Sequence, residues 1–148
     1  MGETRIPAVL REMVRQRAAF LCEYCLAHEE DSASGFHVDH VIAEKHHGPT
    51  EDHNLSLCCP ACNRAKGSDI STRINDKLVR LYNPRIDLWA EHFTLDGAHI
   101  KARSLMGAGT IRLLRMNDPA RVQLRALLMA AGRFPSAAAQ AKILPGRS

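Results

Sequence analysis

Two Cys-x-x-Cys pairs constrain this chain more than any other feature of its sequence. The four cysteines are Cys22, Cys25, Cys59 and Cys62, and 33 residues separate the first pair from the second. Two such pairs are typical of a structural zinc site, in which four thiolates surround the ion tetrahedrally. A redox-active Cys-x-x-Cys normally occurs singly beside a βαβ unit, and an iron–sulfur cluster uses three or four closely grouped cysteines. We therefore predict structural Zn²⁺, with a thiol redox protein as an alternative that metal analysis would test.

The fifth cysteine, Cys58, would enclose three residues rather than two if it paired with Cys62, so we expect an inert, partly buried thiol. An odd, clustered set of cysteines argues against a disulfide framework. The opening MGETRIPAV lacks the apolar core of a secretion signal, and no window approaches the roughly 18 uninterrupted apolar residues of a membrane span. These features predict a cytoplasmic protein without a membrane partner.

Hydrophobic patterning predicts short helices and strands around one core. The chain has 148 residues, of which 45% are apolar and 24% charged, as in ordinary globular domains. Apolar spacing predicts a helix over 7–20, strands over 36–43 and 54–57, and a helix from the second cysteine pair to Gly67. Further along, we expect a helix over 86–93, with Trp89 and Phe93 in the core, and a hairpin over 94–104. Two helices should follow over 107–116 and 120–131, the second with Asp118 as its N-cap. The tail after Pro135 is expected to fray.

Polar residues of catalytic type lie between and just after the cysteine pairs. Asp39 precedes His40, Asn54 follows fourteen residues later, and Asn63 nine residues after that. The segments CEYC, FHVDHVIA, HGPTEDHNLSLC and CPACNRAKG closely resemble the zinc-stapled HNH endonucleases, and the resemblance covers residues 7–67. It implies a ββα-metal core that binds one catalytic divalent ion and hydrolyses DNA to leave a 5′ phosphate and a 3′ hydroxyl.

The resemblance also implies a role for each of these side chains. His40 is similar to the general base of the family, a role that suits imidazole. Asp39 and the side-chain oxygen of Asn63 resemble the protein ligands of the catalytic ion, and Asn54 resembles the residue that holds the connecting loop and orients the base. Asn63 replaces the third residue of the family name, a histidine, which favours an oxygen-preferring ion such as Mg²⁺ or Mn²⁺.

Asp39 and His40 can serve one site only if the strand is irregular at this point. Neighbouring residues of a regular strand point to opposite faces of the sheet. We therefore predict that the strand ends or bulges beside these two residues.

Basic charge is concentrated towards the C-terminal end. Residues 1–98 carry 11 basic and 15 acidic side chains, whereas residues 99–148 carry 9 basic and 1 acidic side chain. Fifteen of the 20 basic residues are arginine, whose planar guanidinium matches phosphate geometry. The candidate DNA contacts are Arg64 and Lys66 on the metal-site helix, and Arg112, Arg115, Arg121 and Arg125 on the last two predicted helices. The alternative is that these side chains are simply solvated.

These observations predict an α+β fold with two parts. Residues 1–67 would form an N-terminal helix and the ββα-metal core with its four-cysteine zinc staple, and residues 68–148 a mainly helical extension packed on that core. We expect a metal-dependent endonuclease acting on double-stranded DNA. The alternative is a noncatalytic zinc-knuckle module that binds nucleic acid, which would not need Asp39, His40 and Asn63 together. The remaining loop histidines, His46, His47 and His53, are expected to be solvent-exposed.

Overall fold

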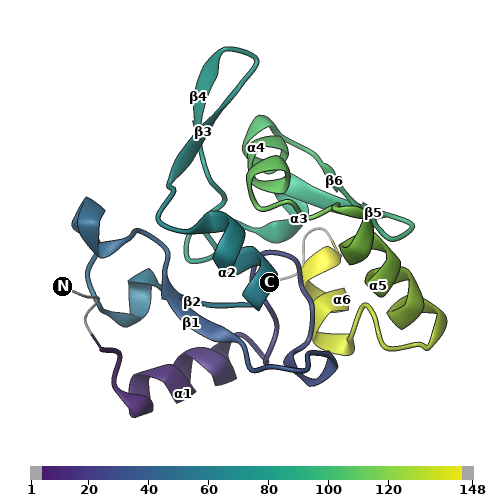
Figure 1. Ribbon diagram of the computed structural model, residues 1–148, viewed down its shortest axis with the longest axis horizontal. Helices are drawn as coiled ribbons and strands as arrows, with labels where there is room; N and C mark the ends of the chain where they lie inside the picture. The colour runs from purple at the N-terminus through teal and green to yellow at the C-terminus, as the bar shows by residue number, and fades with distance from the viewer. Residues whose placement is uncertain (1–4, 145–148) are drawn as a thin grey trace.

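The computed structural model describes residues 5–144, which form an α+β fold of short helices and two-stranded antiparallel sheets (Figure 1). The helices and strands in chain order are α1 (Ala8–Arg17), β1 (His37–His40), β2 (Leu55–Cys58), α2 (Pro60–Lys66), β3 (Ser71–Ile74), β4 (Lys77–Arg80), α3 (Trp89–His92), β5 (Phe93–Asp96), β6 (His99–Ala102), α4 (Leu105–Leu113), α5 (Pro119–Ala130) and α6 (Ala137–Ile143). Short 3-10 helices occupy Glu29–Asp31, Glu44–His46 and Asp52–Asn54. No helix in this described part is long and apolar enough to cross a membrane.

β1, β2 and α2 form the predicted ββα unit. β1 pairs antiparallel with β2, and His40 lies opposite Leu55. β1 ends at His40 rather than at residue 43, because the amide and the carbonyl of Ile42 bond to the side chain of Asn54 instead of to the backbone of a neighbouring strand. The predicted interruption of the strand beside Asp39 and His40 is therefore confirmed, as a strand end.

The second cysteine pair starts α2. Cys59 is the N-cap, and its Sγ accepts a hydrogen bond from the Cys62 amide at 3.4 Å. Pro60 takes the first helical position, where its missing N–H costs nothing. Gly67 ends the helix with a φ of 52°, a conformation that other residues rarely adopt. Both ends of this helix agree with the prediction.

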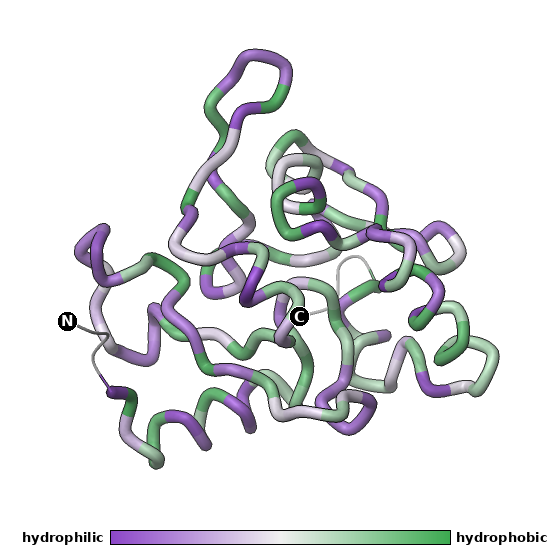
Figure 2. Tube along the Cα trace, in the orientation of Figure 1, coloured by the Kyte–Doolittle hydropathy of each residue, from purple (hydrophilic) through white to green (hydrophobic). Residues whose placement is uncertain are grey.

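α1 packs its apolar face on the ββα unit and exposes its polar face, so hydropathy alternates along it (Figure 2). Val14 and Ala18 are buried, as predicted. The helix ends at Arg17 rather than at residue 20, because Ala19 and Phe20 have positive φ and turn the chain into the first cysteine pair.

One hairpin was not predicted. β3 and β4 pair antiparallel and pack against α4, and their turn extends beyond it (Figure 1). Their two-residue turn, Asn75 and Asp76, has positive φ at both positions, as a type I′ turn requires. This Asn-Asp pair between two short strands is the local signal that predicts the hairpin.

The remaining elements partly follow the prediction. β5 and β6 form the expected hairpin, whereas α3 covers only four residues because Phe93 already begins β5. Pro119 starts α5 as expected, but the carboxylate of Asp118 pairs with Arg115 at 3.0 Å and does not cap the helix. The predicted fraying after Pro135 is wrong, because α6 forms there and buries Ala139 completely.

A single hydrophobic core runs through both parts of the described chain. It includes Leu57 of β2 together with Trp89, Phe93 and Leu114 from the later segment. The indole nitrogen of Trp89 donates to the carbonyl of Tyr24 at 2.8 Å, between the two cysteines of the first pair. The prediction that Trp89 and Phe93 are core residues is confirmed.

Candidate zinc centre and active site

The four cysteines of the two pairs meet in one buried cluster. Cys22 and Cys25 come from the turn after α1, and Cys59 and Cys62 from the start of α2. Their sulfur atoms all lie within 4.8 Å of one another, and those of Cys25 and Cys59 are 3.7 Å apart. Four sulfurs held tetrahedrally at about 2.3 Å from zinc would be separated by about 3.8 Å. The cluster therefore fits one zinc ion, with the four residues predicted as its ligands.

Arg121 of α5 lies against this cluster. Its Nη2 donates to Cys62 Sγ at 3.1 Å and lies 3.8 Å from Cys59 Sγ. Although burial opposes the effect, the neighbouring thiolates raise the pKa of Arg121. The guanidinium offsets part of the negative charge that four thiolates place in the interior. Arg121 therefore supports the zinc site, and its predicted place in a DNA-binding patch is wrong.

Cys58 lies outside the cluster. It is completely buried, and burial raises the pKa of its thiol well above the usual range. A buried, protonated thiol is a poor nucleophile, which agrees with the expected inert cysteine, although the thiol is completely rather than partly buried. Burial of all five cysteines also argues against a thiol redox protein.

A second group of polar side chains lines an open cavity beside the end of β1. Asp39 and His40 of β1 meet Asn63 of α2 around a volume of about 330 Å³, which Glu44 also lines. Carboxylate and amide oxygens are ligands that Mg²⁺ and Mn²⁺ accept. The donor set of Asp39 and Asn63 therefore fits a hard divalent cation, and the structure brings both residues together with His40.

His40 is held from two sides. It is only 5% exposed, and its Nε2 lies 2.8 Å from the hydroxyl oxygen of Thr50. Its backbone carbonyl accepts a hydrogen bond from Lys66 at 3.4 Å. When Nε2 donates to Thr50, Nδ1 carries the lone pair that can accept a proton. The hydrogen bond between Thr50 and His40 was not predicted, because a threonine in a Gly-Pro-Thr turn gives no indication of such a contact.

Asn54 clamps the loop between β1 and β2. It is 4% exposed, and its Oδ1 accepts the Ile42 amide at 2.9 Å. Its Nδ2 donates to the carbonyls of Ile42 and Pro49, each at 2.9 Å. This geometry agrees with the expected role in holding the connecting loop. Orientation of the base by Asn54 stays a prediction.

Two basic residues predicted to contact DNA are buried instead. Lys66 is 2% exposed and bonds to the His40 carbonyl, so its ammonium cannot reach a phosphate on the surface. Arg125 is buried as well, and it donates to the carbonyls of Ala98 at 2.6 Å and Met116 at 2.9 Å. Both predictions are wrong, since these side chains satisfy backbone carbonyls in the interior.

The predicted arginine patch on the last two helices therefore does not form. Arg112 bonds to the backbone carbonyl of Arg73, and Arg115 pairs with Asp118. On α5, Leu124 is 52% and Leu127 68% exposed, whereas Leu128 packs against the core. The helix turns its arginines inward because the thiolates and carbonyl oxygens beneath it need hydrogen-bond donors.

Several predicted surface residues are exposed as expected. Arg64 is exposed on α2, and its contact with DNA stays a prediction. The loop histidines His46, His47 and His53 are also exposed, and His53 lies close to the carboxylates of Glu51 and Asp52.

Comparison with known proteins identifies one family. Residues 22–69 match the family model described as HNH endonuclease. This range contains both cysteine pairs and all the side chains of the candidate active site. No curated protein and no solved structure matches the chain.

Proposed function

Because residues 22–69 carry an HNH endonuclease domain, we propose that this protein is a cytoplasmic, metal-dependent endonuclease that hydrolyses phosphodiester bonds of double-stranded DNA. The observation that carries the proposal is the convergence of Asp39, His40 and Asn63 on one open cavity. A carboxylate, an imidazole and an amide oxygen meet there from β1 and α2.

His40 acts as the general base in this proposal. Its Nδ1 takes a proton from the attacking water, while Nε2 donates to Thr50 and fixes the ring. The water oxygen forms a bond to phosphorus, and the bond from phosphorus to the 3′ oxygen breaks. The departing oxygen takes a proton from solvent, so the products are a 5′ phosphate and a 3′ hydroxyl.

Asp39 and Asn63 would hold Mg²⁺ or Mn²⁺, which supplies positive charge that stabilises the phosphate and the departing oxygen. The two side chains suit such an ion because few protein ligands leave positions for water and phosphate. Asn54 keeps the loop around Thr50 in position, and the zinc cluster ties the start of α2 to the turn after α1. The buried Lys66 joins α2 to the last residue of β1.

The test is plasmid cleavage by His40→Ala. Loss of a general base typically lowers the rate by about 10² to 10⁴, so nicking of supercoiled plasmid with Mg²⁺ or Mn²⁺ should fall by that factor. Zinc content and affinity for DNA should stay near those of the wild type. Undiminished nicking by this variant would exclude the mechanism.

His53→Ala is the matched control. His53 lies on the loop between the same two strands, but its side chain is 65% exposed and has no catalytic role in this mechanism. Its variant should cleave at the wild-type rate. A wild-type protein that binds DNA but does not cleave it with either ion would favour the noncatalytic zinc-knuckle module.

A further inference from the structure

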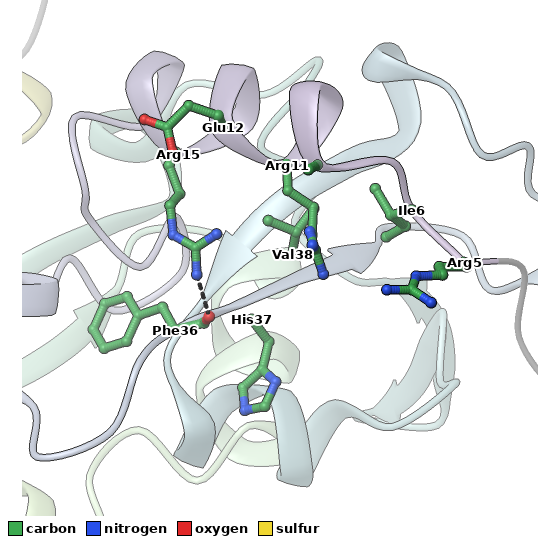
Figure 3. Close-up of a pocket in the computed structure, with 9 residues that line it drawn as sticks. Arg5, Ile6, Arg11, Glu12, Arg15, Phe36, His37 and Val38 are labelled. Atoms are coloured by element: carbon green, nitrogen blue, oxygen red, sulfur yellow. Dashed lines mark hydrogen bonds between the residues drawn. The ribbon is translucent and has the colours of Figure 1, made fainter.

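A second hollow adjoins the candidate active site along β1. It has a volume of about 640 Å³ and lies between α1, the residues before it, and β1 (Figure 3). His37 and Val38 line both this hollow and the cavity that contains Asp39 and His40. The two hollows therefore adjoin each other at β1, and we call the one beside α1 the α1 groove.

The α1 groove carries positive charge that no described carboxylate pairs with at Arg5 or Arg11. Arg5 and Arg11 line it, and the ion pairs among the described residues include neither of them. Arg15 differs, because it donates to the Phe36 carbonyl at 3.0 Å and lies 3.5 Å from a carboxylate oxygen of Glu29. Two guanidinium groups are thus available to a ligand.

The acidic residue of the groove, Glu12, forms no ion pair with either arginine. Glu12 accepts a hydrogen bond from Gln16 at 2.8 Å, and its side chain points away from the floor of the groove in Figure 3. Arg11, by contrast, extends from α1 towards Val38 in the same view, whereas the His37 ring points to the other side of the strand. The exposed His37 lies two residues before Asp39 and so faces the same side of β1.

We propose that the α1 groove binds the DNA backbone next to the phosphate that is cut, with Arg5 and Arg11 each contacting a phosphate. This inference rests on the proposed function. Guanidinium groups match phosphate oxygens in geometry and charge, and phosphate contacts orient a duplex without reading its sequence. Because His37 and Val38 line both hollows, a DNA strand held in the groove would lie beside the cavity that contains Asp39 and His40. This contact surface replaces the one predicted on the C-terminal helices.

The test is binding of a labelled DNA duplex to zinc-loaded full-length protein, without added Mg²⁺ or Mn²⁺, over a series of salt concentrations. Each phosphate contact contributes about 0.9 to the slope of log affinity against log salt. The Arg5→Gln/Arg11→Gln variant should lower the magnitude of this slope by about 1.8 relative to the wild type. Arg5→Gln alone, which changes no residue of α1, should lower it by about 0.9.

The matched control is Lys101→Gln/Arg103→Gln. It removes the same charge from two exposed positions on and just after β6. Its slope should equal that of the wild type. An equal loss in this control would overturn the groove proposal, since it would indicate an effect of net charge.

Cleavage of plasmid, measured in parallel, separates this inference from the proposed function. An active wild-type enzyme whose groove variants keep the full slope would overturn the groove proposal alone. A wild-type protein without measurable affinity for the duplex would also overturn it. A wild-type protein that does not cleave plasmid, but whose dependence of DNA affinity on salt requires Arg5 and Arg11, would support DNA binding by the groove and overturn the proposed endonuclease activity.

Discussion

Gly48 illustrates how one residue determines the geometry of the candidate base. A Cβ atom at this position would lie 1.8 Å from the Ile42 carbonyl oxygen and 2.8 Å from Asn54 Nδ2. Because a Cβ atom is fixed by the backbone, no side-chain rotation relieves these contacts. The loop would have to move away from Asn54, and this loop carries Thr50, the hydrogen-bond partner of His40.

Gly48→Ala should therefore destabilise the protein by about 3 kcal/mol and lower the rate of plasmid cleavage. Thermal unfolding and cleavage rates measure the two effects. Gly35→Ala is the control, because the nearest atom to its Cβ would be Glu29 Oε2, at an ordinary 3.4 Å. Equal melting temperatures for Gly48→Ala and the wild type would contradict this prediction, since the loop would then accept a Cβ atom at residue 48 without loss of stability.

At the scale of elements, α5 connects the extension to the zinc centre. Arg121 reaches the thiolate sulfur of Cys62, and Arg125 bonds to carbonyls that lie outside its own helix. Loss of a hydrogen-bonding partner of a metal ligand typically lowers metal affinity about 10- to 100-fold. α5 is thus expected to stabilise the metal centre without contacting DNA.

Arg121→Gln should weaken zinc retention by about 10-fold or more, measured by competition with a chromophoric chelator. Its DNA affinity should keep the wild-type dependence on salt at full zinc loading. The control is Arg115→Gln, since Arg115 is exposed and pairs with Asp118 away from the cysteines. Equal zinc retention by the two variants would contradict a role of Arg121 at the thiolates.

At the scale of the whole molecule, two metal sites of different strength are expected. A zinc ion held by four thiolates contributes on the order of 10 kcal/mol to the folding of small modules, whereas an ion with two protein ligands exchanges freely. The zinc cluster also lies in the core that joins both parts of the chain. Loss of zinc should therefore unfold the protein, while loss of the catalytic ion should affect activity alone.

Mild treatment with EDTA should stop cleavage before it changes the circular dichroism spectrum, and added Mg²⁺ should restore activity. Metal analysis after dialysis should find about one zinc per chain. If EDTA abolished cleavage only at concentrations that also change the circular dichroism spectrum, the presence of two separate metal sites would be contradicted.

The zinc ligands and the short strands and helix around them follow from the sequence by itself, and the candidate active-site residues follow from its resemblance to the HNH endonucleases. Cysteine spacing, strand alternation and the glycine at 67 act over short distances, so the local pattern contains the information. Whether the basic side chains are buried or exposed to solvent was decided by the tertiary structure. Lys66 and Arg125 are buried, and Arg121 is half-buried, because carbonyls and thiolates from other elements pack against them. A polar position in a helical pattern predicts solvent contact, and only the packed structure supplies the buried acceptors that make an inward-facing cation favourable.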